Sequence, residues 1–205
     1  MLLLLYWIDI LSRKFLEASS LRKSIQMVLV LSIVGMISGA SLVGVYKYTQ
    51  PKIEQNKKEE IRRAIFEVIP QAKSYKTIVK EDKLIYQGLD SSGNLVGYAF
   101  TGEGPGYQGT IEIMIGMDSH LNKVTGIQIL ESVETPGLGA KITSKAFRDQ
   151  FRALVVLPLI ELIKRKKVER PNQIQAITGA TISSQAVVDI LNKTIKETRE
   201  KLLKE

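Results

Sequence analysis

The sequence contains no cysteine and a single histidine, His120, among its 205 residues. The absence of cysteine excludes disulfides, thiolate metal sites, iron–sulfur ligation and a cysteine nucleophile. One histidine, set in a stretch of turn-forming residues, is too little for a histidine-based triad or an ordinary zinc site. We therefore expect no catalytic residues and no metal site in this chain alone.

Charged side chains are absent from the apolar stretch Ser24–Tyr46, whose 23 residues include no Asp, Glu, Lys, Arg or His. As a helix with about 1.5 Å rise per residue it spans roughly 34 Å, and the hydrocarbon core of a bilayer is about 30 Å thick. The apolar core of a cleaved signal peptide is typically only about 7 to 15 residues long. The stretch therefore predicts a retained transmembrane helix over residues 24–46.

The net charge of +8 is concentrated beside this stretch. Residues 1–52 hold six Lys and Arg against two Asp and Glu, which is half of the excess. Cations flanking an apolar span are typical of a membrane protein, so we expect contact with lipid and no binding of nucleic acid. Residues 1–23 are predicted to form an N-terminal interfacial segment. Because Lys and Arg lie on both sides of the span, their count does not decide its orientation.

The remainder of the chain is predicted to hold a stalk helix and one domain. Apolar residues recur at helical spacing within residues 47–72, and Pro70 ends that pattern. From residue 73 to residue 205 we expect one domain, which opens with short runs of β-branched and aromatic residues separated by turns. Four or five antiparallel strands are expected, within 75–80, 84–90, 94–104, 109–118 and 123–134.

Helical spacing returns over residues 144–156 and again from Ser183 to the end. The basic stretch 163–173 is predicted to be a solvated loop or a sheet edge. The expected fold class is therefore α+β, in which a single transmembrane helix precedes an antiparallel sheet covered by helices.

The loop AITGATISS, residues 176–184, carries several hydroxyl groups and no charge just before the C-terminal helix. A helix N-terminus has unpaired backbone N–H groups and about half a positive charge, so it stabilises a phosphate without Lys or Arg. Taken alone, the stretch is explained better by hydroxyls that cap the helix. The candidate phosphate-binding residues are Thr178, Gly179, Ala180, Thr181, Ser183 and Ser184.

Two glycine-rich loops supply further candidates. In ETPGLG, residues 134–139, Pro136 and Gly137 suit the central positions of a type II turn. Such a turn projects backbone N–H groups toward a ligand, although chain reversal alone explains the same residues. In GEGPGYQG, residues 102–109, Tyr107 is available for stacking.

Three motifs, in order behind one membrane helix, carry a resemblance to a known family. They are GYQGTIEIMIGMD at 106–118, ETPGLG at 134–139 and TGAT at 178–181. Together they resemble the FMN-binding subunits of ion-pumping respiratory complexes. These are the G subunits of Rnf ferredoxin:NAD oxidoreductases and the C subunits of Na⁺-pumping NADH:quinone reductases. The resemblance covers residues from about 24 to 198.

The resemblance implies that Thr181, the last residue of TGAT, bears FMN through a phosphoester bond. In the family a separate flavin transferase delivers the FMN from FAD, so the chain needs no catalytic base. The family usually has Asp six residues before the modified Thr, where this chain has Gln175. The loop 134–139 is implied to lie near the flavin ring, with contacts from Glu134, Thr135, Gly137, Leu138 and Gly139.

The implied function is electron transfer by covalent FMN in an ion-translocating Rnf complex. The implied partners are the other Rnf subunits, the flavin transferase and membrane lipid. The family also implies a single-pass protein of the cell inner membrane, with a cytoplasmic N-terminus and its FMN domain on the outer, periplasmic side. Two alternatives stay open: a membrane-tethered module that binds a flavin or another phosphorylated ligand noncovalently, and a purely structural subunit.

Overall fold

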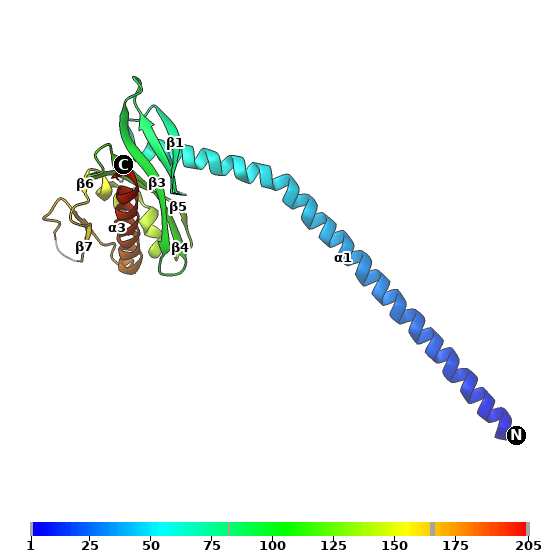
Figure 1. Ribbon diagram of the computed structural model, residues 1–205. Helices are drawn as coiled ribbons and strands as arrows, with labels where there is room; N and C mark the ends of the chain where they lie inside the picture. The colour runs from blue at the N-terminus through cyan, green and yellow to red at the C-terminus, as the bar shows by residue number, and fades with distance from the viewer. Residues whose placement is uncertain (1, 82, 165–166, 204–205) are drawn as a thin grey trace. The chain divides into compact units, whose positions relative to one another are not determined.

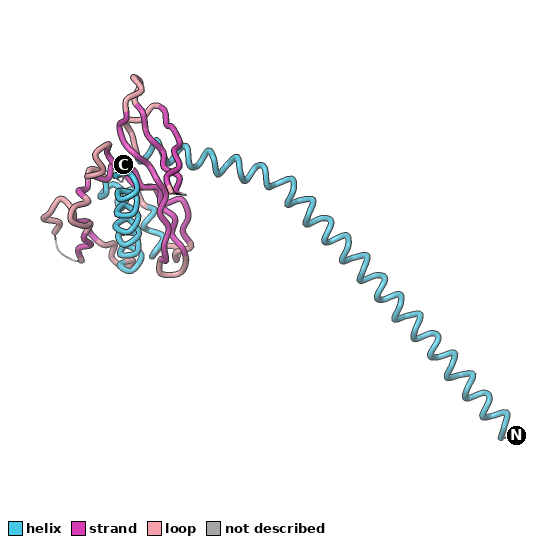
Figure 2. The backbone as a smooth tube through the Cα atoms, viewed as in Figure 1, coloured by secondary structure: helices cyan, strands magenta, loops and turns pink. Residues whose placement is uncertain are grey.

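The computed structural model describes residues 2–81, 83–164 and 167–203 (Figures 1 and 2). The chain divides into two compact units, Met1–Asn56 and Lys57–Glu205. Helix α1 (Leu2–Val68) makes up the first unit and ends within the second. The second unit holds all of the strands.

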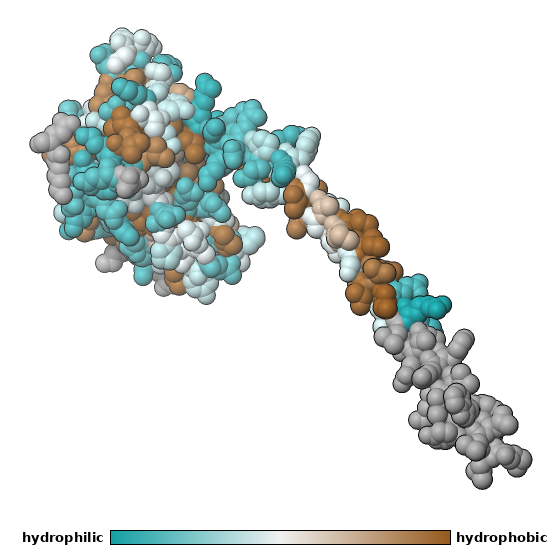
Figure 3. All heavy atoms as spheres, turned by 45° about the vertical axis from the view of Figure 1, so that its right-hand side comes forward, coloured by the Kyte–Doolittle hydropathy of each residue, from teal (hydrophilic) through white to brown (hydrophobic). Residues whose placement is uncertain are grey.

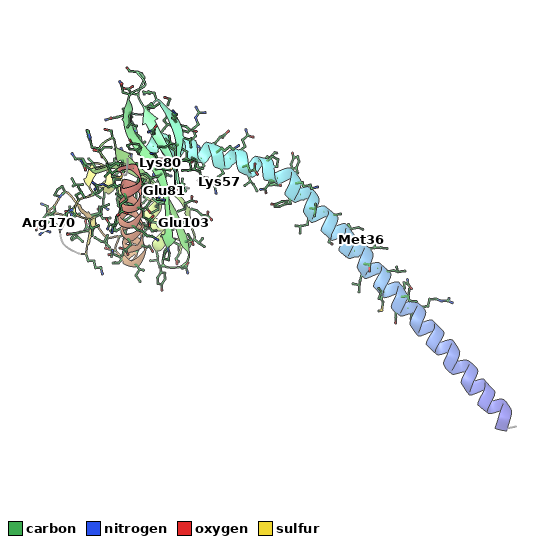
Figure 4. All side chains as sticks on the ribbon, viewed as in Figure 1. Met36, Lys57, Lys80, Glu81, Glu103 and Arg170 are labelled. Carbon is green, nitrogen blue, oxygen red and sulfur yellow. The ribbon has the colours of Figure 1, made fainter. Side chains whose placement is uncertain are left out.

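Helix α1 contains, between Arg22 and Val68, a stretch long and apolar enough to cross a membrane. Its aliphatic side chains are exposed, as at Met36, which is 66% exposed (Figure 4). They form the brown band along the helix in Figure 3. An exposed apolar surface that extends around a whole helix is typical of a segment that contacts lipid. By length and composition, the helix therefore agrees with the expected span over residues 24–46.

The domain is built on a six-stranded antiparallel sheet in which the strands follow one another in chain order, β1 to β6 (Figure 1). The five long strands agree with the five expected runs to within two residues, and the α+β class is confirmed. The strands are β1 (Ser74–Lys80), β2 (Lys83–Leu89), β3 (Leu95–Pro105), β4 (Thr110–Asp118), β5 (Lys123–Ser132) and the short β6 (Leu154–Val155).

Helix α3 (Thr181–Leu203) lies against one face of this sheet, over β3 and β4 (Figure 2). Val187, Leu191 and Ile195 recur along its buried stripe and join the largest apolar cluster, together with Phe100 and Ile113 of the sheet. Burying one such side chain contributes about 1.5 to 3 kcal/mol, so this stripe fixes the helix on the sheet. The N-terminus of α3 is thereby held at the end of β3.

The end of α1 packs on the opposite face of the sheet. Ile65, Val68 and Ile69 are buried there in a second apolar cluster. The helix comes so close that a Cβ at Gly116 of β4 would collide with the carbonyl oxygen of Val68. The same carbonyl accepts a hydrogen bond from Thr125 Oγ1 of β5. Glycine at position 116 is therefore required by the close approach of the helix.

The prediction of one helix over residues 144–156 is wrong. Helix α2 (Lys145–Arg148) continues as the 3₁₀ helix η2 (Asp149–Phe151), and β6 follows. The helix ends at Phe151, because the backbone of Arg152 is extended with a ψ of 124° and Ala153 then takes a left-handed φ of 60°. The basic stretch 163–173 begins with the last residue of the short strand β7 (Glu161–Ile163) and ends with the first residue of β8 (Gln173–Gln175), which pairs with β7 in parallel; residues 165–166 lie outside the described residues. A further 3₁₀ helix, η1 (Gly139–Thr143), follows the 134–139 loop.

Replacing Gly116 by Ala is expected to destabilise the domain by about 1 to 3 kcal/mol, because the new methyl group overpacks the contact with Val68. The matched control is Gly126→Ala on β5, where the new Cβ would lie 3.3 Å from Val68 Cα and should cost less. Thermal unfolding of the full chain in detergent measures both losses. Equal melting temperatures for Gly116→Ala and the unchanged chain would contradict the close approach.

Candidate functional site

The buried carboxylate of Glu134 joins three segments of the domain. Its Oε1 accepts hydrogen bonds from the backbone N–H groups of Tyr107, at 2.6 Å, and Gln108, at 3.2 Å. Its Oε2 accepts a hydrogen bond from Ser183 Oγ at 2.7 Å. The β3–β4 turn, the loop after β5 and the first turn of α3 are therefore held around one side chain.

Glycines make room for this carboxylate. A Cβ at Gly106 would collide with Glu134 Oε1, and a Cβ at Gly139 would collide with Glu134 Oε2. Gly139 also lies against Ser183, because its added Cβ would stand 2.8 Å from Ser183 Oγ. A larger residue at either glycine would separate segments that the carboxylate joins.

Two tight turns bring the candidate motifs together. The N–H of Leu138 donates to Thr135 O at 3.2 Å, and Gly137 has a φ of 77°, so the expected Pro-Gly turn is confirmed. An equivalent turn precedes α3, where Gly179 has a φ of 83°. The two turns meet, since a Cβ on Gly179 would lie 3.6 Å from Leu138 Cδ2.

The hydroxyl groups at the start of α3 have different partners. Thr181 is the first residue of the helix and is half-buried. Ser183 donates its proton to Glu134, and Ser184 Oγ donates to Ala180 O at 2.8 Å while accepting from the N–H of Ile177 at 3.1 Å. In this structure both serines therefore donate to protein acceptors, although the sequence suggested them as donors to a phosphate.

A cavity of about 390 Å³ lies over this junction. Nine of the twelve candidate residues line it, and Ile182 is a tenth lining residue that the sequence did not suggest. Its apolar rim comes from Tyr107, Leu138 and Ile182, which are 64%, 51% and 60% exposed. The remaining lining residues are Glu134, Thr135, Gly139, Gly179, Ala180, Thr181 and Ser183.

Three candidate residues do not line the cavity. Thr178 and Gly137 are exposed, each next to a residue that does line it, and Ser184 is fully buried beneath the helix turn. A signal for Ile182 is present in the sequence. Ile182 lies one position before the buried stripe of α3 begins. A helix packed on a sheet normally presents a polar residue there, so an apolar one is the signal.

A second cavity, of about 410 Å³, lies on the other side of Thr181, between α3 and the end of β3. Thr181 and Ile182 line both cavities. The ionic side chains on the wall of the second cavity are two cations, Lys164 and Lys193, and two anions, Glu103 and Asp189. Among the residues that the structure describes, no group of three or more His, Asp and Glu side chains could hold a metal ion.

Gln175 occupies the position six residues before Thr181 and is exposed at the end of β8. The backbone of Gln175 makes two hydrogen bonds with the side-chain amide of Gln150. Gln175 N donates to Gln150 Oε1 at 2.8 Å, and Gln150 Nε2 donates to Gln175 O at 3.3 Å. The loop into α3 is therefore anchored at its start by η2.

Comparison with known proteins first gives a class of domain. The family model of the FMN-binding domain matches residues 106–196, which include the β3–β4 turn, the 134–139 loop and the start of α3. The chain also resembles a solved structure of the C subunit of Na⁺-translocating NADH-quinone reductase from Parabacteroides distasonis. That likeness has a TM-score of 0.61 at 19% identity, covers 76% of this chain and 97% of the other, and shows the same fold.

Curated relatives narrow this class. The chain is 36% identical to the G subunit of the ion-translocating oxidoreductase complex from Methanosarcina acetivorans, over 83% of this chain and 92% of the relative. It is 32% identical to the G subunit of the Na⁺-translocating ferredoxin:NAD⁺ oxidoreductase complex from Acetobacterium woodii, over 82% and 88% of the two chains. The chain belongs to the family of G subunits of these ion-translocating, or Rnf, oxidoreductase complexes.

Replacing Glu134 by Gln is expected to destabilise the domain by about 1 to 3 kcal/mol. Both carboxylate oxygens of Glu134 accept hydrogen bonds, and the NH₂ group that replaces one of them cannot accept, so at least one donor loses its acceptor. Chemical denaturation of the full chain measures the loss. Ser183→Ala removes only the bond to Oε2, so it should cost less, and the double variant should show non-additive losses. Additive losses would mean that Glu134 and Ser183 do not interact.

Proposed function

We propose that the chain is a membrane-anchored electron-transfer subunit of an ion-translocating ferredoxin:NAD oxidoreductase complex of the Rnf type. It carries FMN on Thr181 through a phosphoester bond. The observation that carries the proposal is the position of Thr181 at the first turn of α3, on the wall of a cavity with an apolar rim.

The phosphate end of FMN fits the start of α3. The first N–H groups of a helix have no partner within the helix, and the helix dipole adds positive potential at that end. An anion bonded to Thr181 Oγ is therefore stabilised by the backbone itself.

The ring end of FMN fits the cavity. Ligand cavities of about 300 to 1,000 Å³ are typical of sites for cofactors, with apolar walls and a few polar groups. The volume of about 390 Å³ falls in this range, and Leu138 and Ile182 offer exposed aliphatic surface on which a planar ring packs. Bound FMN supplies the redox chemistry, while the chain fixes its place and surroundings.

A separate flavin transferase makes the bond. The hydroxyl oxygen of Thr181 attacks the FMN phosphorus of FAD, a new P–O bond forms, the pyrophosphate bond breaks, and AMP leaves. The proton of the hydroxyl passes to the transferase, so this chain needs no base of its own. The other Rnf subunits are the electron-transfer and ion-transport partners.

The apolar stretch of α1 anchors the chain in the cell inner membrane in a single pass. The N-terminus lies in the cytoplasm, and the FMN domain lies on the outer, periplasmic side, in contact with lipid and with the membrane subunits. A covalent link suits that side, because free FMN is scarce there and a lost cofactor would not be replaced.

A second candidate function is noncovalent binding of a flavin or another phosphorylated ligand. It is favoured by Gln175, which lacks the carboxylate usual at that position in the family. A third is a purely structural role, in which the helix and the domain only hold a complex together.

Intact-mass spectrometry tests the covalent bond. The chain produced together with the flavin transferase should gain the mass of one FMN less one water, and Thr181→Ala should gain nothing. Thr77→Ala is the matched control, because it removes an exposed hydroxyl on β1, outside the cavity, and should keep the added mass.

The alternatives give different results. If the unchanged chain gains no mass and its band is not fluorescent on a denaturing gel, yet it retains flavin under native conditions, binding is noncovalent. If Thr181→Ala leaves electron transfer through the assembled complex intact, the chain is structural.

A further inference from the structure

Arg148, at the end of α2, lies outside the flavin cavity but is bonded to three parts of the domain. Its Nε donates to the carbonyl oxygen of Thr143 at 3.0 Å. Its Nη1 donates to Glu67 Oε1 at 2.6 Å and also contacts Gln128 Oε1. The guanidinium therefore connects the last residue of η1, the last turn of α1 and strand β5.

The hydrogen bond to Thr143 fixes the end of a segment that lines the cavity. Thr143 is the last residue of η1, and Gly139, the first, lies against Glu134 and Ser183 and lines the cavity. Leu138, which precedes η1, forms part of the apolar rim. Fixing the carbonyl of Thr143 therefore limits the movement of the whole segment 134–143.

The second contact leads to the end of α1. Glu67 is a sequence neighbour of the buried residues Ile65, Val68 and Ile69. These three side chains pack this part of the helix on the sheet. The side chain of Arg148 is only 18% exposed, whereas that of Glu67 is 44% exposed. A partly buried, charge-assisted pair is stronger than an ordinary surface ion pair.

Arginine is the residue type that suits this position. Its planar guanidinium presents several N–H donors in a fixed fork, so one group bonds a carbonyl and a carboxylate at the same time. Lysine has one ammonium group on a flexible stem and cannot hold the same acceptors in the same geometry.

We propose that Arg148 is a positioning residue for the flavin site, which holds the segment 134–143 to the last turn of α1; Glu134, Thr135, Leu138 and Gly139 of this segment line the cavity. Its role in holding the flavin rests on the function proposed above. The end of the helix that leads to the membrane span and the wall of the flavin cavity are thus joined by a single side chain.

Hydrogen exchange of the full chain in detergent, without flavin, tests the structural half of this proposal. The N–H groups of Leu138, Ala140 and Lys141 are hydrogen-bonded within the segment, so their exchange reports its opening. In Arg148→Gln their exchange should rise about tenfold, and Arg148→Lys should restore little of the protection. Arg152→Gln is the matched control, because Arg152 only pairs with Asp149 on the surface.

Iodide quenching of flavin fluorescence tests the functional half, on protein that carries FMN. Arg148→Gln should make the flavin at least about twofold more accessible to iodide, since a looser wall exposes the ring. Arg152→Gln should leave quenching unchanged. Glu67→Gln, which keeps an acceptor oxygen and removes only the charge, should give an intermediate rise in both measurements.

Exchange and quenching in Arg148→Gln that match those in Arg152→Gln would overturn the proposal. Should Arg148→Gln fail to fold, Glu67→Ala decides, because it removes the acceptor altogether and an unchanged exchange rate in that variant would overturn the proposal. A wild-type chain that takes up no flavin would defeat the proposed function alone, and the exchange measurement would still decide the role of Arg148.

Discussion

Burying the carboxylate of Glu134 costs desolvation free energy of several kcal/mol unless hydrogen-bond donors offset it. Here three donors do so, two from the backbone of the β3–β4 turn and one from Ser183. These donors come from segments far apart in the sequence, so the carboxylate is satisfied only when all three segments meet. The cavity lies over their junction, and its shape depends on this one charged group.

Two helices from opposite ends of the domain then fix the frame around that junction. The end of α1 packs against one face of the sheet and α3 packs against the other. Each approach is close enough to need glycine, at Gly116 beneath α1 and at Gly102 beneath Thr194 of α3. The position of the start of α3 relative to β3 is consequently fixed. The position of the Thr181 hydroxyl is fixed with it.

Much of this arrangement could be predicted from the sequence, because strands and helices are local patterns. The five long strands, the end of α1 near Pro70 and the Pro-Gly turn follow from the side-chain period and turn chemistry. The helix over residues 144–156 was predicted wrongly, since the helical spacing of apolar residues does not show that Arg152 is extended and Ala153 left-handed.

The partners of individual polar groups were less predictable. The sequence suggested that Ser183 and Ser184 bind a ligand and that Glu134 contacts the flavin, but a hydroxyl has several possible acceptors within reach once the chain folds. In the structure Ser183 donates to Glu134, which lies 49 positions away in the sequence, and Ser184 donates to Ala180. Arg148 gave no signal at all, because two of its three acceptors, on Gln128 and Glu67, lie 20 and 81 positions away in the sequence.

The order of the elements along the chain has a consequence for folding. The strands β1 to β5 lie between residues 74 and 132, whereas the helix that covers one face of their sheet begins only at Thr181. That face stays uncovered until the residues of α3 have been synthesised, so the core between sheet and helix cannot form before then.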